Sequence, residues 1–277
     1  MSDRSYLFVP GDDEGAVESA RGSSTDAVIL DLEDTVAESA KEAARRVVVR
    51  TVEEWSPSDP TLYIRVNGLD TEYALTDVAA VLDCDGAPEA LVVPDVRSAT
   101  EVDIVADVLD AASSAVGLVP LVERPEAVFR AHEIATASDR TVALAFGSVD
   151  FRMNVGLSAL DTDADVYLPR YLVSMAASAA GCRALDTVFL DCEDAAGLRA
   201  ETREARRIGF DGKMAIAESQ IPDVHEGFAP TERELDRARR LVAAFEETDS
   251  GVVSFEGTFV DRPVVEQQRR LLDRAAE

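Results

Sequence analysis

The feature that most constrains the fold of this chain is a series of short apolar runs that alternate with longer stretches of helical character. The runs are rich in aliphatic and β-branched residues, which is typical of parallel strands that are buried on both faces. They occur at 6–9, 27–31, 62–66, 90–93, 118–122, 141–146, 187–190 and 213–216. Eight such strands separated by helices predict an α/β fold, a closed (β/α)8 TIM-type barrel, with an open doubly wound sheet as the alternative.

The length and the absence of nucleotide-binding motifs favour the closed barrel. The chain has 277 residues, close to the ~250 that such barrels need. No G-x-G-x-x-G follows the first apolar run, and no G-x-x-x-x-G-K-[ST] occurs, so the nucleotide cradles of open sheets are absent. We expect a barrel over residues 1–226 and a C-terminal extension over 227–277 that carries a helix.

Two helix starts are marked in the sequence. Pro125 opens the helical stretch 125–137 at a position where proline is favoured. Thr231 and Glu234 form a capping-box pattern in front of an apolar stripe in the extension. We expect that stripe to pack into a core.

The charge balance is strongly acidic, with 54 Asp and Glu against 27 Lys and Arg and a net charge of −27. Such a surface repels nucleic acid and anionic membranes, so we expect neither as a partner. The acidic residues are scattered, as on a solvated surface adapted to high salt, which predicts a halophilic source. The three cysteines form no metal or redox motif, and no apolar run is long enough to cross a membrane, so a cytoplasmic location is expected.

Polar residues gather where the predicted strands end. Asp31, Glu33 and Asp34 follow the second run, Arg65 ends the third, Glu123 follows the fifth and Asp150 follows the sixth; Asp95 and Asp191 follow the fourth and seventh. In a barrel these positions converge on the C-terminal rim, where the active sites of this fold lie. Carboxylates so close together need a cation or a raised pKa.

A divalent metal is one partner for these carboxylates. Mg²⁺ takes one or two protein carboxylates and completes its shell with water and substrate oxygens, which suits Glu123 and Asp150. On spacing alone the two residues fit a metal pair or solvated strand ends equally well. Neither His132 nor His225 lies at a strand end, which argues against a zinc site.

At these residues the chain resembles the citrate lyase beta-subunit-like branch of the HpcH/HpaI aldolase family. The resemblance covers nearly the whole chain, and several motifs occur in order. They are RSYLFVPGD at 4–12, DAVILDLEDTV at 26–36, YIRVNGLDT at 63–71, LAFGSVDF at 144–151, GFDGKMAI at 209–216 and FVDRPVV at 259–265.

The resemblance implies a Mg²⁺-dependent carbon–carbon lyase, with Mn²⁺ as a substitute, that acts on a short 3-hydroxyacyl thioester such as malyl-CoA or citramalyl-CoA and releases a keto acid. Glu123 and Asp150 would hold the metal, with Glu123 also bordering the substrate, and Arg65 would bind the substrate carboxylate. The catalytic pocket would include Asp31, Glu33 and Asp34, while Phe8, Pro10 and Gly11 would border the thioester. Asp261 would act as acid or base across a subunit interface of a homotrimer or hexamer, so that residues 227–277 complete a neighbour's site.

Five positions depart from the family pattern. Asp95 stands where lysine is common, Arg124 where threonine is usual and Val149 where glutamate is usual, while Ala217 and Glu218 stand where histidine and proline are usual. These departures leave other functions open. They are a malyl-CoA-type thioesterase, a citrate lyase beta subunit that needs a citryl carrier protein, and a barrel that binds CoA thioesters without catalysis.

Overall fold

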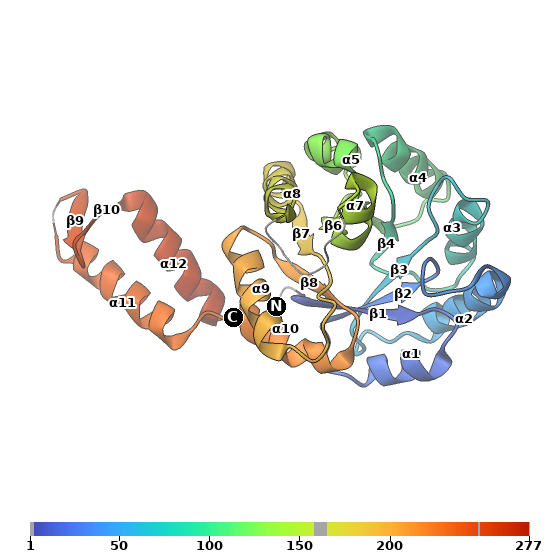
Figure 1. Ribbon diagram of the computed structural model, residues 1–277, viewed down its shortest axis with the longest axis horizontal. Coiled ribbons are helices and arrows are strands. Elements are labelled where there is room, and N and C mark those ends of the chain that lie inside the picture. The colour runs from blue at the N-terminus through green and yellow to red at the C-terminus, as the bar shows by residue number, and fades with distance from the viewer. Residues whose placement is uncertain (1–2, 158–164, 249, 277) are drawn as a thin grey trace.

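The eight-stranded barrel is confirmed by a computed structural model that describes residues 3–157, 165–248 and 250–276. Within these ranges eight parallel strands pair in chain order, and β1 (Ser5–Pro10) closes the barrel against β8 (Gly212–Ala215). Figure 1 shows the helices arranged around the outside of the sheet. The open doubly wound sheet is therefore excluded.

The remaining strands and the helices follow the alternating order that the sequence predicts. The other barrel strands are β2 (Ala27–Asp31), β3 (Thr61–Arg65), β4 (Ala90–Val93), β5 (Gly117–Val122), β6 (Ala143–Phe146) and β7 (Arg183–Asp186). The helices around the barrel are α1 (Glu14–Arg21), α2 (Lys41–Glu54), α3 (Ala74–Leu82), α4 (Ala99–Ala111), α5 (Pro125–Phe129), α6 (Ala131–Ala135), α7 (Ser148–Val155), α8 (Tyr167–Ala180), α9 (Ala195–Arg207) and α10 (Ile221–Phe228).

The alternation of side chains along the strands places the site. In β2, Ile29 points into the barrel, whereas Val28 and Leu30 pack outward with the helices. The next inward position in β2 is Asp31, which pairs in register with Arg65 of β3. Since side chains alternate with a period of two, each strand delivers an inward residue to the rim where the apolar interior stops.

The predicted seventh strand is wrong by about four residues, because the strand is Arg183–Asp186 and residues 187–190 form a loop. The sequence pattern disfavours a strand with charged residues, but these charges are paired. Asp186 is fully buried and accepts hydrogen bonds from Arg170 of α8 at 2.8 and 2.9 Å and from Lys213 of β8 at 2.9 Å. Lys213 also pairs with Glu201 of α9 at 2.5 Å, which completes a buried quartet between barrel and helices.

The predicted helix starts are confirmed, but one predicted helix is broken in two. Pro125 lies in the first turn of α5, and the stretch 125–137 divides at Arg130, whose backbone (φ −111°, ψ 11°) is not helical. Thr231 and Glu234 form the expected capping box.

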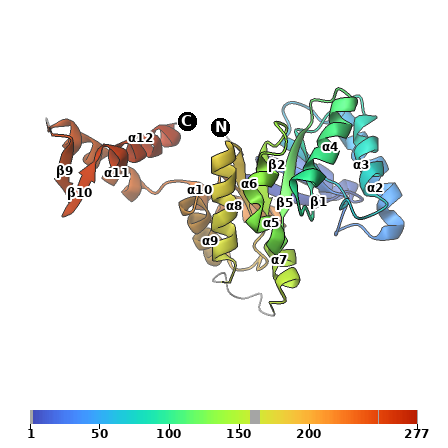
Figure 2. The same cartoon turned by 90° about the horizontal axis from the view of Figure 1, so that it is seen from above.

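The C-terminal extension contains the expected helix together with a hairpin and a second helix. It consists of α11 (Glu232–Glu246), the antiparallel hairpin β9 (Val252–Phe255) and β10 (Thr258–Asp261), and α12 (Arg262–Ala276). Its apolar core includes Leu241, Phe255 and Val260. Figures 1 and 2 both draw the extension to one side of the barrel, beyond α9 and α10. In the described part of the chain, no helix combines the length and the hydropathy that a membrane span requires.

Candidate active site

Arg65 is the centre of the polar cluster at the C-terminal rim. Its Nε and Nη2 donate to the two carboxylate oxygens of Asp31 at 2.7 and 2.6 Å, a bidentate pair with both residues buried. Its Nη1 contacts Glu33 at 2.7 Å and Asp34 at 3.3 Å. The guanidinium also stacks over the Phe8 ring at 4.8 Å. The bidentate pair with Asp31 holds the guanidinium group of Arg65 in place, and its Nη1 atom points toward the exposed Asp34.

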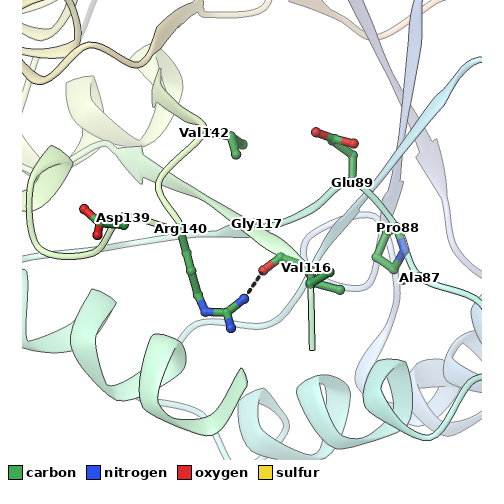
Figure 3. Close-up of a pocket in the computed structure, with 9 residues that line it drawn as sticks. Ala87, Pro88, Glu89, Val116, Gly117, Asp139, Arg140 and Val142 are labelled. Carbon is green, nitrogen blue, oxygen red and sulfur yellow. Dashed lines mark hydrogen bonds between the residues drawn. The ribbon is translucent and has the colours of Figure 1, made fainter. Parts of the chain in front are cut away.

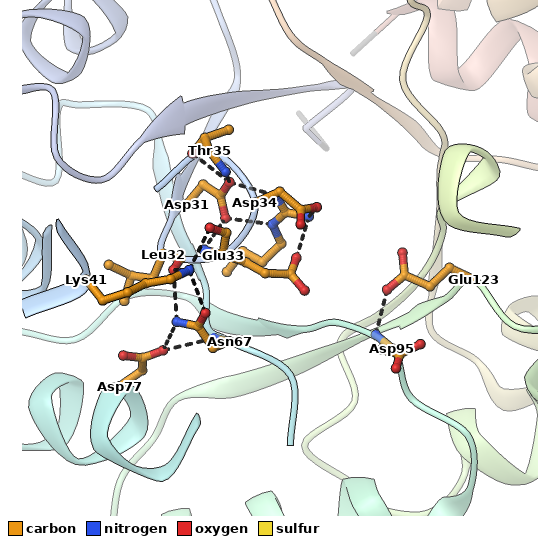
Figure 4. A network of polar contacts seen from close by, with 11 residues as sticks. Asp31, Leu32, Glu33, Asp34, Thr35, Lys41, Asn67, Asp77, Asp95 and Glu123 are labelled. Carbon is orange, nitrogen blue, oxygen red and sulfur yellow. Dashed lines mark hydrogen bonds and ion pairs between the residues drawn. The ribbon is translucent and has the colours of Figure 1, made fainter. Parts of the chain in front are cut away.

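A second set of contacts holds the loop that carries Glu33 and Asp34 (Figure 4). The buried Lys41 donates from Nζ to the Leu32 and Glu33 carbonyls and to Asn67 Oδ1, each at 2.7 Å. Asn67 Nδ2 donates in turn to Asp77 Oδ2 at 2.6 Å. Lys41 thus provides hydrogen bonds to loop carbonyls that have no partner in a helix or sheet. These bonds hold the loop in place and so fix the position of its carboxylates.

Glu123 lies across the rim from this loop, as Figure 4 shows, and is 4% exposed. Its Oε1 accepts the backbone N–H of Asp95 at 2.6 Å. Its Oε2 lies against Gly147, where an added Cβ would be 2.5 Å away. Both carboxylate oxygens of Glu123 are therefore positioned by neighbouring backbone. Because Gly147 has no side chain, the Glu123 carboxylate fits beside it.

Asp150 lies in the first turn of α7, directly after β6. The buried Thr187 fixes the start of this helix, because its hydroxyl accepts the Ser148 N–H at 3.0 Å and donates to Ser148 Oγ at 2.8 Å. A carboxylate in the first turn is also favoured by the helix dipole. The rim therefore presents Asp150 on a fixed element.

The electrostatics separate Asp31 from the other carboxyl groups. Burial disfavours the charge on Asp31, but the hydrogen bonds and charge of Arg65 outweigh it and hold the pKa of Asp31 below its usual range. Burial raises the pKa of Glu33 to about 8, because Arg65 only partly offsets burial and the charges of Asp34, Asp31 and Asp150. Burial, with Glu33 and Asp150 nearby, raises the pKa of Glu123 well above its usual range.

The raised pKa of Asp150 completes this pattern. Burial is again the largest cause, and the charge of Asp34 adds to it against Arg65. Protein carboxyl groups that all resist ionisation are stabilised as anions when a cation joins them.

The donor set fits a hard divalent ion of the magnesium type. In the part of the chain described, no group of three or more His, Cys, Asp and Glu side chains has the arrangement of a metal cage. Mg²⁺ does not require such a cage, since it usually takes one or two carboxylates and keeps waters. Glu123, which packs against Gly147, and Asp150, in the first turn of α7, are suited to be that pair.

The other predicted site residues divide into two groups. Pro10 pairs in register with Asp31, and the Gly11 N–H donates to the Asp31 carbonyl at 2.8 Å. An added Cβ on Gly11 would lie 2.6 Å from that carbonyl, so this position requires glycine. Phe8, Pro10 and Gly11 therefore border the Arg65 cluster. Asp261 ends β10 in the extension, which both views draw apart from the barrel.

Sequence reasoning missed three residues that support the site. Lys41, Asp77 and Thr35 were not singled out, yet Thr35 donates from its hydroxyl to Asp31 at 2.7 Å. Asp77 could have been found, because it interrupts the apolar stretch ALTDVAAVL and a buried carboxylate needs a partner. Arg45 provides that partner at 2.6 Å.

A cleft lies at the opposite end of the barrel. It has a volume of about 370 Å³ and is lined by segments that precede β4, β5 and β6, including Glu89 and Arg140 (Figure 3). Arg140 is held there by the Val116 carbonyl at 2.9 Å. Because the N-terminal end of such barrels serves stability, and no carboxylate of the rim lines this cleft, we place the active site at the rim.

A closed barrel whose C-terminal rim carries an arginine and buried carboxylates has the architecture of a TIM-barrel enzyme. Comparison with known proteins identifies the group within this class. Residues 4–217 match the family model described as HpcH/HpaI aldolase/citrate lyase. The chain belongs to this family and is an enzyme of the carbon–carbon (oxo-acid) lyase type.

Individual relatives span nearly the whole chain. Citrate lyase subunit beta of Escherichia coli is 36% identical and aligns over 98% of this chain and 93% of its own length. A (3S)-malyl-CoA thioesterase of Cereibacter sphaeroides is 35% identical over 98% of this chain and 94% of its own. A crystal structure of protein CitE from Mycobacterium tuberculosis, in complex with magnesium, acetoacetate and coenzyme A, has a TM-score of 0.86 and 34% identity, and covers 100% of this chain and 99% of that one.

Proposed function

We propose that this protein is a Mg²⁺-dependent lyase that cleaves a short 3-hydroxyacyl-CoA such as malyl-CoA or citramalyl-CoA into an acyl-CoA and a keto acid. The observation that carries the proposal is that the buried Glu123, the half-buried Asp150 and Arg65 lie within electrostatic reach of one another at one rim. The magnesium, acetoacetate and coenzyme A in the related CitE structure support the same ligand classes here.

Arg65 is suited to bind the carboxylate end of the substrate. Asp31 already occupies its Nε and Nη2, so the substrate carboxylate would bind at Nη1 and displace the weaker 3.3 Å contact with Asp34. Charge-assisted hydrogen bonds of this kind give both affinity and orientation. Glu123 and Asp150 would hold Mg²⁺, which supplies Lewis-acid polarisation of the substrate oxygens when bound.

Cleavage also needs proton movement between the hydroxyl group, the carbon that becomes the acyl-CoA methyl group, and solvent. In the metal-free site, burial raises the pKa of Glu33 to about 8, and its carboxyl group lies 2.7 Å from Arg65. Its pKa suits a group that gives and takes a proton at the working pH. We assign the other proton-transfer role to Asp261 of a neighbouring copy.

Exposed apolar side chains support an assembly of copies, as a homotrimer or hexamer, in which the extension reaches a neighbour. Phe129 of α5, Met153 of α7 and Leu168 of α8 are 86%, 68% and 63% exposed, and Phe259 of the extension is 72% exposed. Large apolar surface of this kind marks interaction sites. Mixing an Asp261→Ala preparation with a Glu123→Gln preparation should restore activity if sites are completed in trans; a mixture as inactive as its components would count against this arrangement.

The product assay separates lyase from thioesterase activity. Malyl-CoA with Mg²⁺ should yield equal amounts of acetyl-CoA and glyoxylate, whereas a thioesterase would yield malate and free CoA. The 35% identity to the malyl-CoA thioesterase makes hydrolysis the second candidate. Absence of both products with malyl-CoA and citramalyl-CoA would refute the proposal. Co-purification with partner subunits and a carrier protein would instead favour the citrate lyase beta role that the Escherichia coli relative suggests.

A further inference from the structure

We infer that Asp95 and Arg124 form a positioning pair that orients the metal ligand Glu123. The backbone N–H of Asp95 contacts Glu123, and Arg124 holds Asp95 in place. The inference rests on the proposed function, because it takes Glu123 as a ligand of Mg²⁺. It assigns a role to two of the positions at which the chain departs from its family.

The backbone of Asp95 is the first observation. Asp95 has φ +54°, in the left-handed region that residues other than glycine seldom adopt. In this conformation its N–H points to Glu123 Oε1 at 2.6 Å, across the gap between the neighbouring strands β4 and β5. An uncommon conformation that makes a specific contact at a functional rim calls for something that stabilises it.

The side chain of Asp95 provides that stabilisation. Arg124 binds its carboxylate in bidentate fashion, through Nε to Oδ1 and through Nη2 to Oδ2 at 2.6 Å. Arg97 Nη2 adds a contact to Oδ2 at 2.9 Å and is itself tied to Asp70 at 2.8 Å. The Asp95 side chain is 20% exposed and that of Arg124 27%, so solvent only partly competes for these contacts.

The arrangement has a direct consequence for Glu123. Arg124 follows Glu123 in the chain, so the same short segment supplies both the ligand and the group that holds Asp95 against it. With Oε1 bound to Asp95 and the Gly147 backbone beside Oε2, the carboxylate has little freedom to rotate. Groups that orient a metal ligand typically change metal affinity 10- to 100-fold when they are removed.

The test measures Mn²⁺ binding by electron paramagnetic resonance on the full-length protein, alongside thermal unfolding. Asp95→Ala and Arg124→Ala should each raise the Mn²⁺ dissociation constant at least about tenfold, with the double variant close to either single one, because the two act through one contact. Asp95→Gly should bind Mn²⁺ more tightly than Asp95→Ala, since glycine adopts positive φ freely and keeps the N–H.

Two controls separate the alternatives. Ser113→Ala changes an exposed residue with φ +53° at the end of α4, so it should lower stability slightly and leave the Mn²⁺ dissociation constant unchanged. Glu123→Gln should abolish Mn²⁺ binding. If Glu123→Gln abolishes Mn²⁺ binding while Asp95→Ala and Arg124→Ala bind Mn²⁺ as the wild type does, the positioning role of Asp95 and Arg124 is refuted. Glu123 then remains a metal ligand. If Glu123→Gln still binds Mn²⁺ normally, the metal assignment itself fails.

Discussion

The close contact between Gly147 and Glu123 makes Gly147→Ala a sharp perturbation of the site. Gly147 has φ −102° and ψ 99°, which alanine adopts without strain, so the substitution acts through space alone. The new Cβ would lie 2.5 Å from Glu123 Oε2 and 3.0 Å from Glu123 Cβ. Ordinary contacts begin near 3.4 Å, so the oxygen must move by about 0.9 Å, the difference between 3.4 and 2.5 Å.

A displacement of this size is large for a metal ligand. Mg²⁺ binds oxygen at ~2.0–2.1 Å with little tolerance, so we expect the dissociation constant for Mg²⁺ or Mn²⁺ to rise at least about tenfold. Overpacking of a buried site should also destabilise the fold by about 1–3 kcal/mol. Isothermal titration with Mg²⁺ and urea unfolding measure the two effects separately.

A matched control exists at the end of α1. Gly22 has φ −87°, and a Cβ there would meet its nearest neighbour at 3.7 Å, so Gly22→Ala should change neither metal affinity nor stability appreciably. If Gly147→Ala binds the metal within twofold of the wild type and unfolds at the same urea concentration, Glu123 is not packed at Gly147 in the way described, and the reasoning is wrong.

Three further perturbations test other parts of the molecule. Burial opposes the charge on Asp26, yet hydrogen bonds from His225 and from the Arg4 and Ser5 backbone lower its pKa to about 2 from 3.8. The charged Asp26 therefore contributes about 2 kcal/mol to the free energy of unfolding above pH ~4, and this contribution is lost as the pH falls toward 2. Asp26→Asn should therefore be less stable than wild type at pH 7 by urea unfolding, and the difference should vanish near pH 2; a constant difference would contradict this. Lys213→Met leaves Glu201 and Asp186 short of a buried partner and should cost about 3–5 kcal/mol of unfolding free energy, while a cost under 1 kcal/mol would show that the network is dispensable. Because 54 acidic residues face 27 basic ones, dialysis from about 2 M to about 0.1 M KCl should lower the melting temperature, and an unchanged value would refute the halophilic interpretation.

The fold was predictable where strands are apolar throughout. Ala27–Asp31 and Ala90–Val93 match the predicted runs residue for residue, since burial on both faces leaves an unbroken apolar signal. The seventh strand escaped detection because Arg183 and Asp186 carry charge, and the partners of Asp186, which are Arg170 and Lys213, come from distant segments. Local pattern does not encode such long-range pairing.

The residues of the candidate site were predictable because they lie at the ends of strands, but most of the contacts between them were not. The inward direction of Asp31 and Arg65 follows from the two-residue alternation of their strands. Spacing identifies Asp95 only as a residue that follows the fourth strand, whereas its role depends on a positive φ and on Arg124, neither of which a spacing argument contains. The part played by Asp261 remains a prediction, since it concerns a second copy of the chain.

The buried quartet of Arg170, Asp186, Glu201 and Lys213 has a consequence for the history of this barrel. Two acids and two bases balance formally, and each of them lies within the protein interior. Replacing one member leaves an uncompensated buried charge, whereas replacing the whole set by apolar residues of similar volume need not destabilise the fold. The four positions are therefore expected to covary among descendants of a common ancestor, being inherited together as one unit and exchanged through compensating substitutions rather than one at a time.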